Sequence, residues 1–196
     1  MLFNRDDIRK VAVVEPTTTK GVKSALIGQK SLLAYDKAAK ELAQYVGEIK
    51  EDTTIRAISK GQWSMHDLIK YAALQIGEPC KLFLTTWTVT QQPVEALFQF
   101  HQQGIITDIY ALFDYRIKER KPEAFQFLNS FSKAIALGKC HAKVSVLIGE
   151  KKAISIYGSG NLSKNPRLEA YVIFSSYETA KQDELWIMEE ITQKKN

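Results

Sequence analysis

The chain has 196 residues, 45% of them hydrophobic and 25% charged, a composition that excludes a disordered or fibrous protein. This length is enough to bury a sizeable core, and two cysteines are too few for a disulfide framework. The net charge of +5 mildly favours a polyanionic partner such as nucleic acid.

The N-terminal residues do not have the pattern of an export signal. The segment MLFNRDDIRK becomes charged after three residues and lacks the apolar stretch of a secretory signal. The sequence also contains no run of about 18 apolar residues that could span a bilayer. We therefore expect a cytoplasmic protein with no membrane partner.

Residues 1–50 are expected to form an N-terminal arm and a helix that packs on the core. The apolar run Val11–Val14 predicts a short edge strand, followed by a loop. In Ser31–Ile49, apolar residues recur at helical spacing, which predicts an amphipathic helix. This helix either caps the sheet or mediates contacts between two copies. Capping is preferred, because most amphipathic helices bury one face on their own core.

In residues 51–196, segments with strand character alternate with helical segments. Ser64 and Asp67 fit a capping box at a helix start, and Pro93 and Pro122 suit the first turns of two further helices. This alternation predicts one compact domain, an α/β sandwich with a mixed β-sheet flanked by helices. The predicted strands are Thr53–Ile58, Lys81–Trp87, Ile105–Phe113, Ala134–Leu137, Val144–Ile148, Ala153–Tyr157 and Tyr171–Phe174, and a closing helix covers Tyr177–Thr192.

The basic stretch Lys118–Lys121 (KERK) is predicted to be a loop. A solvated connection is the preferred interpretation, because charge runs usually face water. The alternative is a contact with a phosphate backbone near a cleft.

The chemistry-bearing residues gather around a predicted hairpin. Two β-rich runs, Val144–Ile148 and Ala153–Tyr157, flank the polar turn 149–152. Because side chains alternate along a strand, His141 and Lys143 share one face of the first run. Cys140 takes the opposite face and is expected to be a small buried residue.

The second run of the hairpin ends in Gly158-Ser159-Gly160-Asn161. Two glycines allow the backbone to turn sharply and to approach a ligand closely. An imidazole, an ammonium, a hydroxyl and a carboxamide therefore converge at one end of the hairpin. Such a set of groups suits a phosphate.

These residues resemble the motif of the phospholipase D superfamily, in which His-x-Lys is followed by a strand pair and then Gly-Ser-x-Asn. The resemblance covers roughly residues 50–190, and it implies a phospholipase D-like fold. Glu169 lies where family members often carry an acid that hydrogen-bonds the catalytic histidine. The matching residues are His141, Lys143, Gly158, Ser159 and Asn161.

The sequence departs from the family pattern at two points. The family usually has an Asp five residues after the Lys, and here that position is Ile148. The interval to Gly158 is also longer than usual. Either Glu150 replaces the missing Asp or the hairpin is simply longer.

The resemblance implies double displacement at a phosphodiester, with His141 as nucleophile and the partner subunit's His141 as general acid. One chain carries one copy of the motif, so a complete site requires a homodimer. Lys143, Ser159 and Asn161 would hold the phosphate, and Glu169 would orient His141. We expect no metal and no cofactor, because the three histidines lie on different predicted elements, with His66 and His101 as ordinary surface or helix-face residues.

Three functions remain open at this point. The leading hypothesis is a metal-independent phosphodiesterase, most simply a nuclease. The first alternative is a module with the same fold that binds nucleic acid without cutting it. The second alternative is a hydrolase of phospholipids or other small diesters.

Overall fold

The computed structural model of the protein describes residues 37–164 and 166–193. The predicted arm and the strand at Val11–Val14 lie outside the described residues. The described part is built on a seven-stranded mixed sheet, and this confirms the predicted α/β class. The strands are β1 (Thr53–Lys60), β2 (Cys80–Thr86), β3 (Ile106–Asp114), β4 (Ala134–Gly138), β5 (Val144–Ile148), β6 (Ala153–Gly158) and β7 (Leu168–Ser175).

The strands lie in the order β1-β7-β6-β5-β2-β3-β4. The neighbours β2, β3 and β4 are parallel, and β5 returns antiparallel to β2. The remaining pairs, β5 with β6, β6 with β7 and β7 with β1, are also antiparallel. The ends of β2, β3 and β6 therefore meet the beginnings of β5 and β7 at one edge of the sheet.

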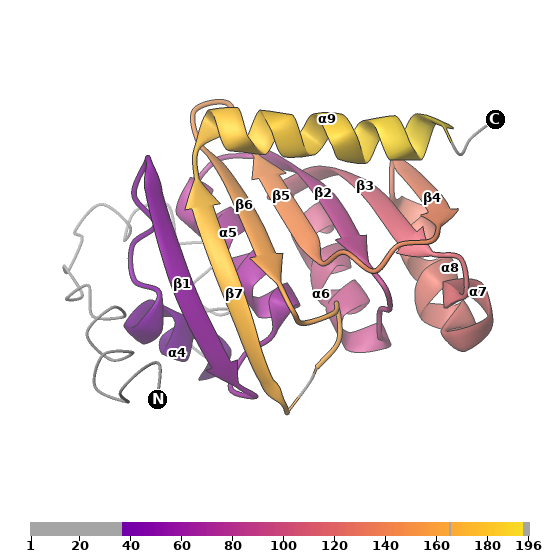
Figure 1. Ribbon diagram of the computed structural model, residues 1–196, viewed down its shortest axis with the longest axis horizontal. Coiled ribbons are helices and arrows are strands. Elements are labelled where there is room, and N and C mark those ends of the chain that lie inside the picture. Colours follow the sequence, from indigo (N-terminus) through magenta and orange to yellow (C-terminus); the bar gives the residue numbers. More distant parts are fainter. Residues whose placement is uncertain (1–36, 165, 194–196) are drawn as a thin grey trace, which may run out of the picture.

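Helices cover both faces of the sheet (Figure 1). Helix α9 runs across the strands on one face, and α5, α6 and α8 lie behind the sheet in this view. The helices are α4 (Lys37–Tyr45), α5 (Met65–Ile76), α6 (Gln91–Gln102), α7 (Ile117–Arg120), α8 (Pro122–Phe131) and α9 (Tyr177–Gln193).

Each face of the sheet has its own apolar core, as alternation along the strands requires. Leu82 and Leu147 point to the core shared with α4, α5, α6 and α8. Phe83 and Val146 point to the smaller core under α9. Leu42 of α4 is fully buried, so this helix packs on the core as the preferred interpretation required.

Local sequence signals fix several helix ends. Ser64 and Asp67 form the predicted capping box at the start of α5. The helix ends at Gly77, whose φ of 73° lies in the left-handed region that favours glycine. These signals were readable from the sequence because they act over a few residues.

The structure corrects two local predictions. The basic stretch Lys118–Lys121 was expected to be a loop, but most of it forms the short helix α7. His66 was expected to be a surface or helix-face residue, but it is buried on α5, where Nδ1 lies 2.7 Å from Oγ of Ser64. Lys118–Lys121 is nevertheless exposed along its whole length, as the preferred interpretation of a solvated segment requires, whereas His66 is buried with a polar partner at the start of its own helix.

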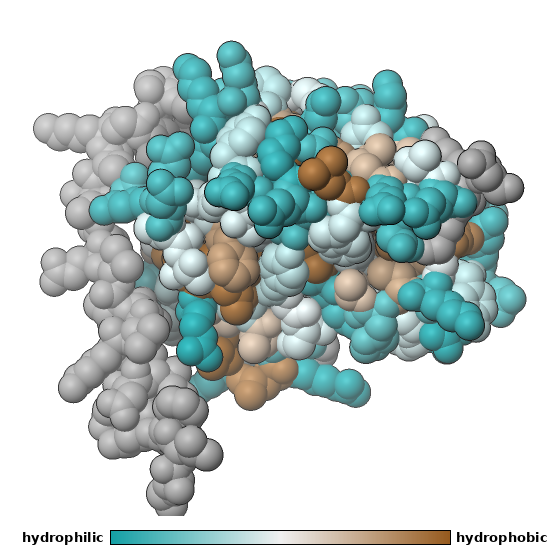
Figure 2. Space-filling view, turned by 45° about the horizontal axis from the view of Figure 1, so that its top comes forward, coloured by the Kyte–Doolittle hydropathy of each residue, from teal (hydrophilic) through white to brown (hydrophobic). Residues whose placement is uncertain are grey.

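Hydrophilic residues dominate the view along α9, and hydrophobic surface reaches the exterior over β7 and β1 (Figure 2). There Ile58 is 47% exposed and Leu168 is 68% exposed, so this part of the sheet face is open. No helix in residues 37–164 and 166–193 is long and apolar enough to cross a membrane.

Candidate active site

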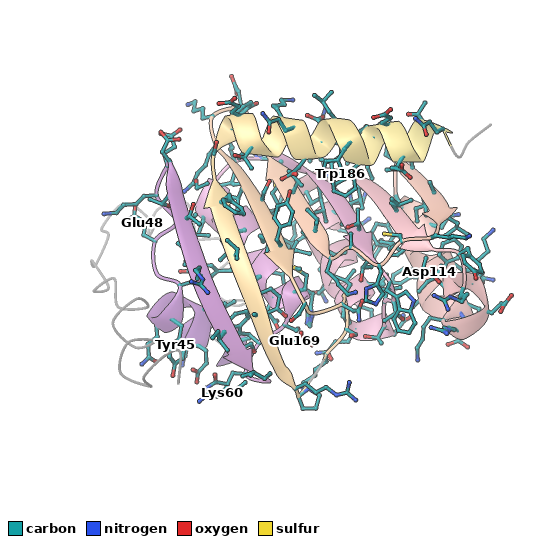
Figure 3. The ribbon with its side chains drawn as sticks, viewed as in Figure 1. Tyr45, Glu48, Lys60, Asp114, Glu169 and Trp186 are labelled. Carbon is teal, nitrogen blue, oxygen red and sulfur yellow. The ribbon has the colours of Figure 1, made fainter. Side chains whose placement is uncertain are left out.

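The candidate residues lie along the sheet edge where five neighbouring strands begin or end. Glu169 is at the start of β7, Ser159 follows β6, Lys143 precedes β5, Trp87 follows β2, and Asp114 ends β3. In Figure 3 the labelled Glu169 and Asp114 mark the two ends of this row. The strand order places these five strands side by side, so residues that are far apart in the sequence become neighbours.

His141 and Lys143 are in direct contact. The ammonium Nζ of Lys143 lies 3.1 Å from Nδ1 and 3.3 Å from Nε2 of His141, and it donates to the backbone carbonyl of His141 at 2.6 Å. His141 is exposed whereas Lys143 is buried. These residues precede β5, which begins at Val144, so the contact lies just outside the strand.

The ammonium of Lys143 sits in a partly desolvated position. Burial lowers the pKa of Lys143, because the charged form loses hydration, and the nearby Cys140 and Glu169 oppose this effect. The backbone carbonyl of Lys143 accepts a hydrogen bond from the N–H of Gly158 at 3.0 Å. This bond ties the residues before β5 to the turn after β6.

Ser159 and Glu169 contact each other. The Ser159 hydroxyl donates to Oε2 of Glu169 and accepts a hydrogen bond from the N–H of Ala170 at 3.0 Å. The resemblance implies a hydrogen bond of Glu169 with His141, which stays a prediction. The bond of Glu169 with Ser159 holds the turn after β6 against β7. The charge of Glu169 still acts on the site through Lys143.

Asn161 is held by Thr86, the last residue of β2. The Thr86 hydroxyl lies 3.3 Å from Oδ1 of Asn161 and accepts from the N–H of Leu162, also at 3.3 Å. Val89 and Leu162 form a parallel bridge beside this contact. The carboxamide is therefore positioned by β2 as well as by the hairpin.

The two glycines of the turn are required for a reason that differs from the predicted one. Neither Gly158 nor Gly160 has a positive φ, so backbone freedom is not the requirement. Both pack on the buried ring of Tyr171. A Cβ on Gly158 would lie 2.4 Å from Cδ1 of that ring, and a Cβ on Gly160 would lie 2.3 Å from the hydroxyl.

Sequence reasoning left Trp87 without a role, and the structure places it beside His141. The two ring centroids are 6.0 Å apart. The guanidinium carbon of Arg120 lies over the indole at 4.4 Å, and that of Arg116 at 5.7 Å. The sequence did contain a signal for this grouping. Trp87 ends one predicted strand and Arg116 follows the next, and the ends of two consecutive strands lie together if the strands are parallel neighbours.

The residues that mark departures from the motif lie away from this edge. Ile148 is buried in the core under α9, and Glu150 is exposed on the turn at the opposite end of the hairpin. Cys140 is buried, as predicted. In the described ranges, no three His, Cys, Asp or Glu side chains are grouped to hold a metal ion.

The fold of the chain defines its structural class. No family model and no curated protein matches the sequence. The structure is similar to that of Nuc from Salmonella typhimurium, a phospholipase D family member, with a TM-score of 0.57 and 16% identity. The match covers 72% of this chain and 95% of Nuc. The chain therefore has a phospholipase D-like fold.

Two further solved structures are similar at lower TM-scores. Polyphosphate kinase from Porphyromonas gingivalis matches with a TM-score of 0.46 and 12% identity, over 89% of this chain and 29% of the kinase. TrmBL2, an archaeal chromatin protein whose structure shows a novel mode of DNA binding, matches with a TM-score of 0.45 and 12% identity. That match covers 83% of this chain and 62% of TrmBL2.

Proposed function

We propose that this protein is a phospholipase D-type phosphodiesterase that cleaves nucleic acid with a histidine nucleophile and without a metal ion. The observation that carries the proposal is the contact of Lys143 with His141, at a sheet edge that also holds Asn161. An exposed imidazole beside an ammonium and a carboxamide suits attack on a phosphate. The phospholipase D-like fold and the net charge of +5 support the same reading.

In the proposed reaction, a ring nitrogen of His141 attacks phosphorus and the bond to the leaving oxygen breaks. The partner subunit's His141 gives its proton to that oxygen. Water then attacks phosphorus, the P–N bond to His141 breaks, and the partner's His141 takes the water proton. This returns His141 to a free imidazole and the partner's His141 to its protonated form. Imidazole suits both roles near neutral pH.

The other residues of the proposed site either donate hydrogen bonds to the phosphate or hold the turn that carries the donors. Lys143 and the amide NH₂ of Asn161 donate to the non-bridging oxygens, whose negative charge grows in the transition state. Ser159 directs its hydrogen at Glu169, so we assign both to holding the turn after β6. Glu169 additionally favours the charged form of Lys143.

The proposed site is shared by two copies of the chain. The sequence holds one His-x-Lys motif, and double displacement needs two imidazoles. An isologous twofold contact would bring His141 and the partner's His141 to one phosphate. Because His141 is exposed, its ring is accessible to both a substrate and a second subunit.

The test is cleavage of single- and double-stranded DNA in excess EDTA, with His141→Ala and with His101→Ala as the matched control. His101 lies on α6, where its ring contacts Phe131 and the carbonyl of Ile106. We expect EDTA-resistant cleavage that falls by at least about a thousandfold in His141→Ala and persists in His101→Ala.

Other outcomes of this experiment would favour the alternative functions or contradict the proposed nucleophile. DNA binding without cleavage by the wild-type protein would favour the binding module. Cleavage of short-chain phosphatidylcholine but not of DNA would favour the lipid or small-diester hydrolase. Equal cleavage by wild-type protein and His141→Ala would contradict the histidine nucleophile.

A further inference from the structure

The ring of Trp87 joins the candidate nucleophile to two arginines. It lies 6.0 Å from the ring of His141, and the guanidinium carbons of Arg120 and Arg116 lie over it at 4.4 Å and 5.7 Å. A guanidinium over an indole is held by the cation–π attraction. Both cations therefore lie on the ring that borders His141, although they come from a different part of the chain.

Arg116 is also fixed by a carboxylate. Its Nε donates to Oδ1 of Asp114 at 2.6 Å, and its Nη2 donates to Oδ2 at 3.2 Å. Asp114 is only 3% exposed, so the carboxylate is itself held rigidly at the end of β3. This pairing lowers the pKa of Asp114 and raises that of Arg116, and both groups stay charged.

Arg120 differs from Arg116 in its partners. The hydrogen bonds of Asp114 go to Arg116, and Arg120 is exposed on α7, where the structure gives it an aromatic partner. An aromatic contact does not neutralise the guanidinium charge, so Arg120 keeps its capacity to bind an anion. The exposed Lys118 and Lys121 add positive charge around it.

These groups lie beyond the atoms that the proposed reaction uses. The phosphate under attack is held by Lys143 and Asn161, and no role remains there for Arg116 and Arg120. A guanidinium binds a phosphate through two parallel N–H donors. The chemistry that fits the guanidinium of Arg120, whose fork is not used by Asp114, is therefore a second phosphate.

We propose that Arg120, held on Trp87, binds the phosphate adjacent to the diester at His141. The substrate is then a polynucleotide with consecutive phosphates rather than an isolated small diester. This inference rests on the proposed function, because it takes His141 as the reacting group.

The test compares two substrates in Arg120→Gln and in a matched control, Arg56→Gln. Arg56 is an exposed arginine on β1, at the other side of the sheet. The substrates are a single-stranded oligonucleotide and bis(para-nitrophenyl) phosphate, which has one phosphate. For Arg120→Gln we expect kcat/KM to fall about tenfold more for the oligonucleotide than for the single diester. Equal losses for the two substrates would overturn the inference.

A binding measurement separates this inference from the proposed function. Fluorescence anisotropy with a labelled oligonucleotide, in a His141→Ala background, should show weaker binding for Arg120→Gln than for Arg56→Gln. The slope of log Kd against log salt concentration should also fall by about one unit for Arg120→Gln, which corresponds to the loss of one phosphate contact. This result would support the subsite even if the protein cleaves nothing. Unchanged affinity and slope would overturn the subsite even if His141 is the nucleophile.

Discussion

The Ser159 hydroxyl donates a hydrogen bond to Oε2 of Glu169. The same hydroxyl accepts from the N–H of Ala170 at 3.0 Å, and the N–H of Ser159 donates to the carbonyl of Ala170, also at 3.0 Å. Three hydrogen bonds therefore fasten the turn after β6 to β7. The turn also carries Asn161, so these bonds fix a group that the proposed function needs.

The first prediction concerns the acceptor that Glu169 provides. Glu169→Gln keeps a carbonyl oxygen for the Ser159 hydroxyl, whereas Glu169→Ala removes it. We expect Glu169→Ala to lose about 1 kcal/mol of unfolding free energy, or about 2–4 °C in Tm, and Glu169→Gln to lose less. Thermal unfolding followed by circular dichroism measures this, and equal losses in both variants would contradict the role of the hydrogen bond.

The second prediction concerns pH. The charge of Glu169 raises the pKa of Lys143 against the lowering caused by burial. Proposed catalysis needs the ammonium form, so activity should decline as the pH rises through the pKa of Lys143. Glu169→Gln removes the favourable charge, and the alkaline limb of kcat/KM should move to lower pH. A limb that stays in place or moves to higher pH would contradict this coupling.

The third prediction concerns the cost of burying Lys143. At neutral pH its ammonium is charged in the folded and unfolded states, and burial penalises the folded one. Lys143→Met should therefore raise the unfolding free energy by roughly 0.5–2 kcal/mol at pH 7, while oligonucleotide cleavage is lost.

Because burial lowers the pKa of Lys143, the destabilisation is present at neutral pH and is lost at alkaline pH. As the pH rises above the lowered folded-state pKa, the folded protein releases the proton and the penalty shrinks. It disappears above the unfolded value of about 10.4, so the advantage of Lys143→Met should vanish there. Urea unfolding at pH 7 and near pH 10.5 measures both limits. A variant less stable than the wild type at pH 7 would show that the ammonium contacts with His141 outweigh desolvation.

The elements around the site were predictable where the signal is local. The hairpin of β5 and β6 shows two short apolar runs around a polar turn, and the Ser64 capping box spans four residues. The grouping of Trp87 and Arg116 near His141 was not predictable in this way. It depends on β2 lying between β5 and β3, and strand order is decided by packing between distant segments.

The contact of Ser159 with Glu169 likewise follows from register. Alternation along β7 gives the face of the sheet on which Glu169 lies, but it does not say which residue lies opposite. The pairing of Gly158 with Tyr171 decides this, and it brings Ser159 beside Ala170 and Glu169. The resemblance supplied one expected partner, His141, but only the register identifies Ser159 as a partner of Glu169.

The last prediction concerns the packing of the turn glycines on Tyr171. A Cβ at Gly160 would lie 2.3 Å from the Tyr171 hydroxyl and 3.2 Å from Cζ, whereas a Cβ at Gly158 would lie 2.4 Å from Cδ1 and 2.7 Å from Cε1. We expect Gly158→Ala and Gly160→Ala each to cost about 1–3 kcal/mol of unfolding free energy, because both overpack a buried ring.

The Tyr171→Phe background distinguishes the two glycines, because it removes the hydroxyl and keeps the ring. The hydroxyl is buried and has no hydrogen-bond partner among the described residues, so its removal should be nearly neutral. In that background Gly160→Ala should lose most of its cost, whereas Gly158→Ala should keep its full cost. Double-mutant cycles from urea unfolding measure both coupling energies. Equal coupling at the two positions would contradict this packing, since only one of the two clashes involves the oxygen atom.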